Sequence, residues 1–546
     1  MRFFYALVLL VLLALTSICA QTPGMITGRV VSDSGQPLAN AKIMLRPSGL
    51  LQTSASTITD RDGKFQMSGL EPRPYQLTVW LSAYTPFTPS TNYRVGDSVR
   101  VVLTKGGVIT GTVTKQTGEP VVGVRVRARM IDAESNLLSP GFFAPEQATD
   151  DRGVYRIYGL RTGTYVVWAG GGGGRGVDSG IDPFDDFVPT YSPGSTRDSA
   201  AEINVRAGEE VSNVDIRFRG EPGHVISGRA IQSKSAQSSN FLLNLTAIGK
   251  GRSDWNMITV QPDDSRRFVF RGVDNGEYDL TALPMVADGP GSEVASKRIK
   301  VNGADVTGIE LVTEPLASVS GRVVLEEANK TECSGKQRPL FSETLVSAAQ
   351  DESQPSDYQF PLLLKAPAGA DANGNVSLKN LPPGRYFFVP EFAAKYWYLQ
   401  SITLPPPPGA KPVDATRNWT TLKSGDRLSG LTITLAQGAA SLSGQVVDNR
   451  ADNLLLYLVP AEKERAEDVL RFFGAAVGPD GKVALTNLPP GRYWSLVKSN
   501  TEVLTDKLRM PDQKELRASL RREAEAAKSA IDLKPCQHLT DFKLNQ

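Results

Sequence analysis

A short phrase, roughly Gly/Asn-Leu-x-Pro-Gly-x-Tyr, returns five times along this chain of 546 residues. Its copies begin at Gly69, Gly159, Gly272, Asn380 and Asn487, and they end at Tyr75, Tyr165, Tyr278, Tyr386 and Tyr493. The tyrosines recur about every 90 to 115 residues, which is the size of a small domain rather than of a solenoid turn. The phrase therefore predicts a tandem array of similar domains, with the five tyrosines in equivalent places.

A second phrase opens each repeat with apolar residues that alternate around a glycine. These glycines are Gly28, Gly111, Gly228, Gly321 and Gly444. Strict alternation of this kind predicts a strand with one buried face and one wet face. A glycine on the buried face weakens a strand, so its return indicates that a bulky group approaches the backbone there. We expect that group to be the recurring tyrosine.

The order of strand and turn signals is the same in each repeat. An opening strand, a polar turn and a second strand are followed by a hairpin that leads into the tyrosine phrase, and a late strand ends the repeat. Hairpin turn glycines are Gly63, Gly153, Gly374 and Gly481, whereas the third repeat has no clear one. About seven short strands per roughly 100 residues predict an all-β fold, a tandem array of five Ig-like or transthyretin-like β-sandwiches.

The repeats give the expected domain boundaries. We call residues 21–104, 105–219, 220–314, 315–437 and 438–546 the first to fifth blocks. The second block carries a long loop, residues 169–200, which is rich in glycine and acidic residues and which we expect to be mobile. Its acidic residues Asp178, Asp182, Asp185 and Asp186 leave a calcium site as an alternative.

One helix is predicted, over residues 512–531, packed on the last sandwich. Asp512 and Glu515 resemble a capping box. One face of this helix is apolar, with Leu516, Leu520, Ala524, Ala527 and Ile531. The solvated side is expected to carry the basic residues Arg521, Arg522 and Lys528.

The first 20 residues read as a secretory signal. Arg2 supplies the positive start, residues 6–15 the apolar core, and residues 17–20 a small-residue cleavage site, so the mature chain is expected to begin near Gln21. A retained membrane anchor is the alternative, but the apolar stretch of about 14 residues is short of the roughly 20 that a span needs. A lipoprotein anchored through Cys19 is a further alternative. We expect a secreted, periplasmic or cell-envelope protein with no membrane span in its mature chain.

Two cysteines remain after the signal, Cys333 and Cys536. In an oxidising compartment such a pair can form a disulfide, which here would tie the fourth block to the carboxyl-terminal tail. Two free buried thiols are the alternative.

Composition argues against several classes of function. The net charge of +2 and the lack of a basic stripe make nucleic acid an unexpected partner. Only His224 and His538 are available as bases, and neither lies beside a nucleophile motif. We therefore expect no enzyme, no catalytic residue, no cofactor and no metal site, with an enzyme built on paired carboxylates as a remote alternative.

The opening strand, the Gly-x-Pro-Leu turn, the Asp-x-x-Gly hairpin and the Leu-Pro-Pro-Gly-x-Tyr phrase together resemble the carboxypeptidase regulatory-like domain. That resemblance implies a transthyretin-like sandwich, related to collagen-adhesin B-type and starch-binding-like sandwiches. Tandem copies of this kind look like secreted bacterial surface or periplasmic proteins. The resemblance implies a fold rather than an activity, because such sandwiches host many functions.

Two functions follow as hypotheses. The first is a non-catalytic, exported scaffold or adhesion-type protein that binds an envelope protein or a glycan through loops of rigid sandwiches. The second is a carbohydrate-binding array, in which aromatic rings act as flat platforms for sugars. The candidate rings are Trp80, Tyr84, Trp168, Tyr191, Trp397, Tyr398 and Trp419, with core packing as the alternative for each.

Overall fold

The structure is a computed structural model. It describes residues 24–48, 55–87, 92–131, 146–171, 183–231, 241–248, 257–260, 262–263, 265–284, 293–328, 333–335, 338–351, 367–405, 412–446, 454–478, 481–499 and 508–544. The expected signal peptide lies outside these described residues, as do Asp178 and Asp182. By the contacts among its residues, the chain divides into two compact units. The first comprises residues 1–47 and 52–105, and the second comprises residues 48–51 and 106–546.

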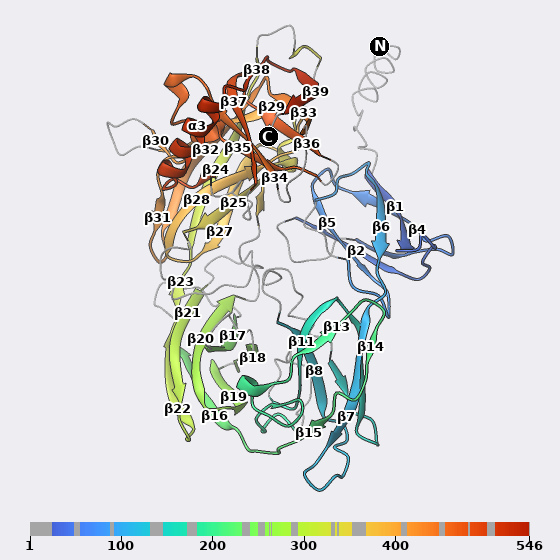
Figure 1. The fold of residues 1–546 in the computed structure, drawn as a ribbon. Coiled ribbons are helices and arrows are strands. Elements are labelled where there is room, and N and C mark those ends of the chain that lie inside the picture. Colours follow the sequence, from blue (N-terminus) through green and yellow to red (C-terminus); the bar gives the residue numbers. More distant parts are fainter. Residues whose placement is uncertain are drawn as a thin grey trace, which may run out of the picture. The chain divides into compact units, whose positions relative to one another are not determined.

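The described part of the chain is built of β-sheets with one α-helix, α3 (Lys514–Ala527), which confirms the all-β fold class (Figure 1). Four short 3-10 helices accompany it: η2 (Arg197–Ser199), η4 (Phe341–Glu343), η6 (Lys463–Arg465) and η7 (Val469–Arg471). The division into five separate domains with the boundaries given above stays a prediction.

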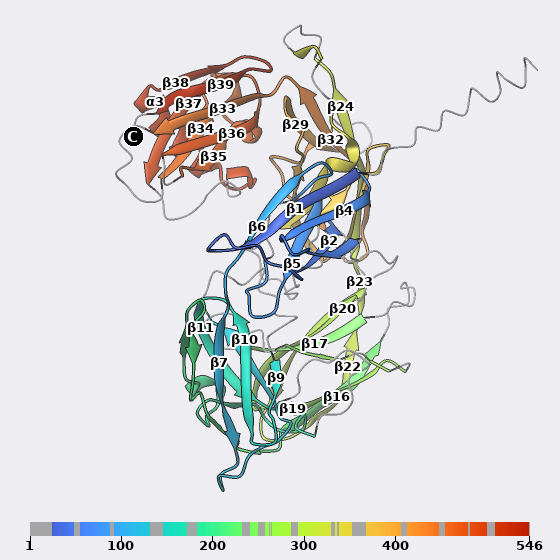
Figure 2. The same cartoon turned by 90° about the vertical axis from the view of Figure 1, so that its right-hand side faces the viewer.

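The first block forms two three-stranded sheets around one core. Its strands are β1 (Gly24–Ser32), β2 (Lys42–Pro47), β3 (Ala55–Ile58), β4 (Lys64–Leu70), β5 (Tyr75–Trp80) and β6 (Ser98–Leu103). The sheet orders are β4-β1-β6 and β3-β2-β5, and β1, β4 and β6 lie side by side in Figure 2. β1 is antiparallel to β4 and parallel to β6. Ile26, Leu77 and Val101 are among the side chains that both sheets bury between them.

The second block repeats this plan with more strands in each sheet. Its sheet orders are β10-β7-β14 and β12-β11-β8-β9. Its strands are β7 (Gly107–Thr114), β8 (Arg125–Met130), β9 (Glu146–Ala148), β10 (Val154–Leu160), β11 (Gly163–Ala169), β12 (Thr190–Tyr191), β13 (Ile203–Val205), β14 (Glu210–Val211) and β15 (Ile216–Arg217). The late strand is split into β14 and β15, because the Asp215 carboxylate takes the place of a ladder carbonyl and accepts the Thr112 amide at 2.8 Å.

The third block has sheet orders β19-β16-β22 and β18-β17-β20-β21-β23. Its strands are β16 (His224–Ile231), β17 (Phe241–Ile248), β18 (Met257–Val260), β19 (Arg267–Val273), β20 (Gly276–Pro284), β21 (Glu293–Val301), β22 (Val306–Val312) and β23 (Glu314–Pro315). As in the first block, the opening strand is antiparallel to the hairpin strand and parallel to the late one.

The fourth and fifth blocks follow the same plan. The fourth has β24 (Ala317–Glu326), β25 (Leu345–Gln350), β26 (Ala368–Gly369), β27 (Asn375–Leu381), β28 (Gly384–Glu391), β29 (Trp397–Leu404), β30 (Val413–Asp414), β31 (Thr420–Leu422) and β32 (Arg427–Gln437). The fifth has β33 (Ala440–Val446), β34 (Leu454–Pro460), β35 (Phe473–Ala476), β36 (Lys482–Leu488), β37 (Gly491–Ser499), β38 (Ala530–Leu533) and β39 (His538–Leu544). Their opening strands β24 and β33 again run parallel to the late strands β32 and β39.

The repeated tyrosine has the same role in all five blocks, as predicted. Each ring is buried, and each hydroxyl donates a hydrogen bond to the backbone carbonyl four residues earlier. The bonds are Tyr75 to Glu71 at 3.1 Å, Tyr165 to Arg161 at 2.9 Å, Tyr278 to Asp274 at 2.9 Å, Tyr386 to Pro382 at 2.7 Å and Tyr493 to Pro489 at 2.7 Å. The tyrosine therefore fixes the turn that leads into its own strand.

The first residue of the phrase makes a β-bulge. Its backbone is left-handed in every copy, with φ of 78° at Gly69, 78° at Gly159, 67° at Gly272, 59° at Asn380 and 59° at Asn487. The register of the hairpin strand against the opening strand shifts at this position in each block. Glycine and asparagine are the residues that enter this conformation most readily, which explains why only they occupy the place.

The expected partner of the opening glycine was wrong. A Cβ added to the glycine would meet a backbone carbonyl of the late strand, not the tyrosine. Its distance to that oxygen would be 2.3 Å for Gly28 to Val99, 2.1 Å for Gly111 to Val214, 2.1 Å for Gly228 to Ile309, 2.0 Å for Gly321 to Leu431 and 2.6 Å for Gly444 to Phe542. The glycine therefore lets the parallel first and last strands of a block approach each other.

The hairpin turn is the same in the third block, although its glycine is missing. Arg266 takes the glycine's place with φ of 61°, and its carbonyl accepts the Ala230 amide, as the Gly63 carbonyl accepts that of Val30. The Arg266 guanidinium donates to the buried Glu293 carboxylate at 3.1 Å and lies 4.7 Å from the centre of the Phe241 ring. These contacts of the Arg266 side chain thus offset the strain of its left-handed backbone.

Helix α3 is shorter than predicted. It begins after Gln513, no side chain caps it, and the predicted capping box is absent. Leu520 and Ala524 are buried against β34 and β37, as expected, whereas Ala527 is exposed and Ile531 lies in β38. The helix also buries Arg517, which the sequence pattern did not indicate.

The long loop of the second block is not the mobile segment that we expected, in the part that the structure describes. Residues 183–200 contain β12 and η2, and Val188, Thr190 and Tyr191 are buried. Phe184 and Phe187 pack on Phe218 of the block's core. Residues 183–191 of the loop thus cover their own sandwich.

Candidate binding surface

The candidate rings divide into buried and open ones. Trp397 is fully buried, and Trp168 and Tyr191 are exposed by 7% and 5%, with their rings stacked at 5.6 Å. The expectation that these three rings form open platforms is wrong, because each packs against protein. The sequence could not show this for Trp168, since the ring that covers it, Tyr191, lies near the far end of the long loop that follows β11.

The fourth block half-buries a further ring. Trp419 meets the edge of Phe387 at 5.5 Å, and the Arg385 guanidinium lies 5.0 Å from the centre of its indole. Tyr398 is half-buried, and burial raises its pKa. These rings therefore serve mainly as packing groups.

Trp80 is the most open of the candidate rings, with 48% of the residue exposed. It ends β5 and stands opposite Lys42 of β2, which in turn stands opposite Ile58 of β3. Met44 and Arg46 point to the same side of the sheet, because side chains alternate along a strand. We call this side of the three-stranded sheet the β2–β3–β5 face. Tyr84, also half-buried, forms an isolated antiparallel β-bridge with Lys105, the residue that follows the first block.

The fourth and fifth blocks meet at a bonded junction. Cys333 and Cys536 form a disulfide with Cα atoms 5.5 Å apart, across 203 residues of chain. Asn487, the bulge residue of the fifth block, donates to the carbonyls of Ala394 and Trp397 at 2.8 Å each. The Gly438 amide donates to the Tyr396 carbonyl at 2.8 Å. Covalent and hydrogen bonds therefore hold these two blocks together.

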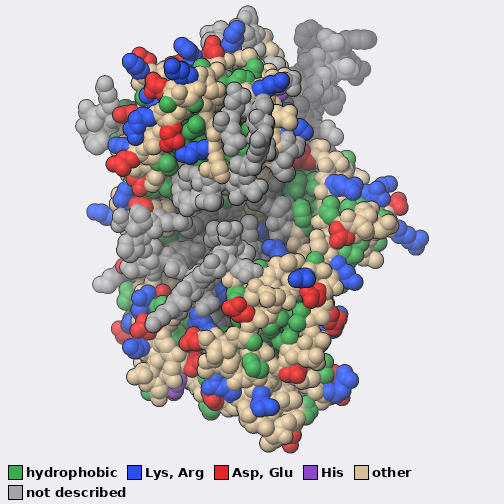
Figure 3. All heavy atoms as spheres, in the orientation of Figure 1, with side chains coloured by type: hydrophobic (Ala, Val, Ile, Leu, Met, Phe, Trp, Pro, Cys, Tyr) green, Lys and Arg blue, Asp and Glu red, His purple; other side chains and the backbone are tan. Residues whose placement is uncertain are grey.

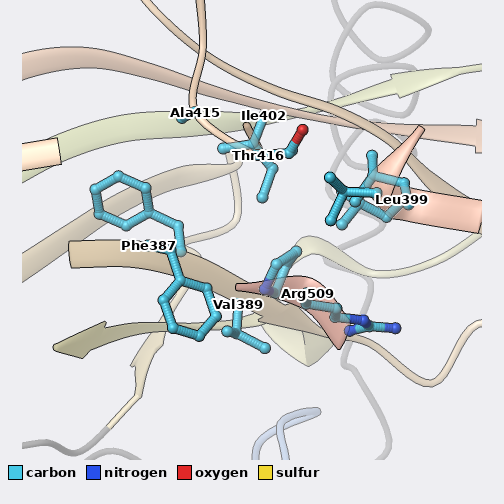
Figure 4. A pocket seen from close by; sticks show the side chains of 11 residues that line it. Phe387, Val389, Leu399, Ile402, Ala415, Thr416 and Arg509 are labelled. Atoms are coloured by element: carbon cyan, nitrogen blue, oxygen red, sulfur yellow. The ribbon is translucent and has the colours of Figure 1, made fainter. Parts of the chain in front are cut away.

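A pocket lies between the fourth and fifth blocks, and Figure 4 shows side chains that line it. Phe387, Val389 and Leu399 of the fourth block line it together with Val469 and Arg509 of the fifth. Its volume of about 310 Å³ includes space open to solvent, and its lining is mainly apolar. The second and third blocks also touch, through an ion pair of 3.3 Å between Asp186 and Arg271.

The two histidines lie near a serine and an aspartate, respectively His538 near Ser441 and His224 near Asp305. Ser441 and His538 face each other on the parallel strands β33 and β39, with Oγ and Nδ1 2.6 Å apart, and no described carboxylate hydrogen-bonds to this histidine. His224 lies 3.9 Å from Asp305. Among the described residues, no cluster of His, Cys, Asp and Glu has the arrangement of a metal site.

Turn chemistry accounts for the repeated aspartates. The Asp150 carboxylate accepts the amides of Arg152 and Val154, and the Asp371 carboxylate accepts those of Asn373 and Asn375. A hydrogen bond from the Arg152 side chain, followed by these amides, lowers the pKa of Asp150. These aspartates are thus hairpin residues.

Charges are mixed on the surface. Basic and acidic side chains are interspersed over the face that Figure 3 shows. Of the helices in the described part, none combines the length and apolar character that crossing a bilayer demands.

A protein-family model matches the first block. Residues 25–104 match the family model of the carboxypeptidase regulatory-like domain, which confirms the resemblance of the first block. No curated protein matches the chain.

Three solved structures are similar to parts of the chain. The Bacillus anthracis TIE protein has 9% identity and a TM-score of 0.16, with 93% of this chain and 75% of that protein covered. A streptococcal ancillary pilin has 11% identity and a TM-score of 0.16, with 54% and 99% covered. Two B repeat units of the collagen-binding protein of Staphylococcus aureus have 12% identity and a TM-score of 0.13, with 76% and 100% covered. Similarity this slight carries no argument about function.

Proposed function

We propose that this chain is a non-catalytic, exported scaffold or adhesion-type protein of the cell envelope, whose β-sandwich blocks hold binding surfaces for an envelope protein or a glycan. The observation that carries the proposal is where the repeated residues make their contacts. The tyrosine, the opening glycine and the hairpin aspartate bond or pack within their own block, and the bulge residue Asn487 bonds to the neighbouring block. The repeated chemistry thus stabilises the fold, and no catalytic group recurs with it.

The junction of the fourth and fifth blocks supports the same proposal. A disulfide and side-chain hydrogen bonds restrict movement between neighbours, which a spacer for binding surfaces requires. A disulfide also suits an oxidising compartment.

Expression of the full chain from residue 1 in a bacterial host, followed by fractionation and mass mapping, tests this function. We expect the envelope or medium fraction to contain a chain that begins near Gln21 and carries the Cys333–Cys536 bridge. A matched chain without residues 1–20 should remain in the cytoplasm with both thiols free. Cytoplasmic retention of the full chain would contradict the proposal.

Carbohydrate binding is the second candidate function, and Trp80 is the observation that favours it. Its open ring has the exposure that stacking on a sugar requires, whereas Trp168 and Trp397 are covered. A glycan array probed with the wild-type chain and with Trp80→Ala separates the two functions. Binding that the substitution abolishes supports sugar recognition, and absence of binding leaves the scaffold alone.

A further inference from the structure

The opening and late strands lead the chain into and out of each block. The late strand of one block ends a few residues before the opening strand of the next, since β6 ends at Leu103 and β7 begins at Gly107, and β32 ends at Gln437 and β33 begins at Ala440. Apart from β23, each other described strand of a block lies between these two strands in the sequence. Tension between two distant points of the chain must therefore cross a block from its opening strand to its late strand.

These two strands are parallel neighbours, which decides how a block responds to tension. In the first block, residues 27–32 of β1 pair in unbroken register with residues 98–103 of β6. Tension pulls on the start of β1 and on the end of β6, and these lie at opposite ends of the pair. The two strands can part only by sliding past each other, which strains all the hydrogen bonds between them at once.

The third, fourth and fifth blocks have the same arrangement. β16 is parallel to β22, β24 to β32 and β33 to β39. The ladder of the fourth block joins residues 318–326 to residues 427–436, and its two strands lie side by side in Figure 2. In an antiparallel pair both loaded ends would lie together, and the bonds would break one after another. The parallel pair therefore resists tension better than an antiparallel pair of equal length.

The second block has an interrupted form of this ladder. β14 and β15 each pair with two residues of β7. Between them, the Asp215 carboxylate accepts the amide and the hydroxyl of Thr112 at 2.8 Å each. One side chain thus completes the row of bonds between the opening and late strands, and its substitution changes the resistance of this ladder alone.

The disulfide gives tension a different path through the fourth and fifth blocks. Cys333 follows the opening strand β24 of the fourth block, and Cys536 precedes the late strand β39 of the fifth. The covalent path therefore runs along β24, across the bridge and along β39. The loop that the bridge closes spans 203 residues. Because β32 and β33 belong to this loop, the ladders of these two blocks are not sheared while the bridge is intact.

From this topology we infer that the chain carries tension along its length, in two different ways. The first three blocks resist through their parallel ladders, and the bridge removes the greater part of the fourth and fifth blocks from the path of the force. Reduction of the bridge makes the loop of 203 residues available for extension, which is roughly 700 Å of extended chain. This inference rests on the proposed exported scaffold and names tension between its attachment points as what the scaffold withstands.

Single-molecule stretching of the full chain, held by protein tags at its two ends, tests the role of the bridge. In the oxidised chain we expect the total extension to fall short of the full extended length by roughly 700 Å, the length of the closed loop of 203 residues. Reductant should restore this length in further steps that require force, because the β24–β32 ladder then carries the tension. Cys333→Ser/Cys536→Ser should extend as the reduced chain does.

The second block tests the parallel ladder itself. Asp215→Ala removes two hydrogen bonds between β7 and the late strand. It should raise the unfolding rate of this block at constant force about tenfold, which corresponds to roughly 1.4 kcal/mol. The matched control is Asp150→Ala, which removes two bonds to backbone amides within the hairpin turn, outside the ladder. It should leave the rate under force near that of the wild type, although both substitutions should lower stability in urea.

Three outcomes would overturn the inference. They are equal extension of the reduced chain and of a chain in which mass mapping finds the bridge, equal acceleration by Asp215→Ala and Asp150→Ala, and extension of the reduced fourth block without a step that requires force. If Asp215→Ala does not fold, the two extension measurements still decide. The comparison of the aspartates involves neither export nor the bridge, so its failure and a failure of the proposed function are distinguishable.

Discussion

At the scale of single residues, the repeated tyrosines link stability to pH. Burial raises the pKa of Tyr278, Tyr386 and Tyr493 above the ordinary value near 10. The folded state therefore keeps these hydroxyls neutral, whereas the unfolded chain ionises them from about pH 10 upward. Their contribution to stability is complete below that pH and is lost as pH rises above it.

We predict that the free energy of unfolding falls above about pH 10, by up to about 1.4 kcal/mol per pH unit for each buried tyrosine. Tyr386→Phe should reduce this slope and should cost about 1 kcal/mol at pH 8, because its hydroxyl bond to Pro382 is lost. Urea unfolding at several pH values measures both effects. Tyr158→Phe, at an exposed position, is the control. Tyrosinate absorbance from all tyrosines of the folded chain near pH 10 would contradict the prediction.

The opening glycine supports a second prediction at this scale. Gly321→Ala would place a Cβ 2.0 Å from the Leu431 carbonyl oxygen, and both groups belong to paired strands that cannot part without loss of the ladder. We expect a loss of about 3 kcal/mol in the unfolding of the fourth block. Gly369→Ala, whose Cβ would meet only a side chain at 3.8 Å, should change stability little. Equal effects of the two substitutions would refute the close approach.

At the scale of elements, the hairpin of the third block depends on a buried charge. Thr313 and Arg266 both donate to one oxygen of Glu293, at 2.5 and 3.1 Å, and the glutamate has no exposed surface. Arg266 thus adopts an unfavourable left-handed backbone conformation, and its guanidinium neutralises the Glu293 carboxylate.

We predict that Arg266→Gly destabilises the third block by about 3 kcal/mol, although glycine relieves turn strain of about 1 kcal/mol. The double variant Arg266→Gly/Glu293→Gln should be more stable than the single variant, since the unpaired buried charge is gone. Thermal unfolding of the four chains in this cycle gives the coupling energy. If the glycine variant matches or exceeds the wild type, the ion pair has no structural role.

The sequence predicted the local features of strands and turns, but not the contacts between segments that lie far apart in the chain. The alternation around Gly28, the hairpin aspartates and the tyrosine phrase act within a few residues, so the sequence showed the strands and the equivalence of Tyr75 with the other tyrosines. The partner of Gly28 lies at Val99, and the register between two such distant strands has no local signal. Trp168 is buried for a similar reason, because Tyr191 covers it from the far part of the long loop that follows β11.

At the scale of the whole molecule, the disulfide joins the stability of two blocks. The sequence suggested the pair Cys333 and Cys536 from compartment and cysteine number, but not the contacts around it. In the structure, Gln437 donates to the Cys333 carbonyl, and the Cys536 amide donates to the Gly438 carbonyl. The bridge therefore lies on the connection between the fourth and fifth blocks.

We predict that reduction, or Cys333→Ser/Cys536→Ser, lowers the stability of these two blocks by about 3 to 5 kcal/mol, because a long loop is released in the unfolded chain. Scanning calorimetry with and without reductant should shift only the transition that contains them. The first block, which has no cysteine, is the internal control. A uniform shift of every transition, or none, would disagree with this assignment.

Asn487 gives a sharper test of the junction, because its two roles can be separated. Glycine keeps the left-handed bulge at φ of 59° but removes both hydrogen bonds to the Ala394 and Trp397 carbonyls. With each bond contributing about 1 kcal/mol, Asn487→Gly should open the junction about 30-fold more often. The amides of Gly438 and Ala439, which donate to the Tyr396 carbonyl, should then exchange hydrogen faster by a similar factor.

The control for Asn487→Gly is Asn380→Gly, which makes the same change at the bulge of the fourth block, with φ also 59°. If the faster exchange came from a looser bulge in general, both substitutions would produce it. If it comes from the bonds across the junction, only Asn487→Gly will, and reduction of the disulfide will add to the effect, since the bridge and the asparagine hold the same pair of blocks at different points. Unchanged exchange at Gly438 and Ala439 in the reduced Asn487→Gly chain would mean that other contacts, such as those around Val469 and Arg509, hold the two blocks together.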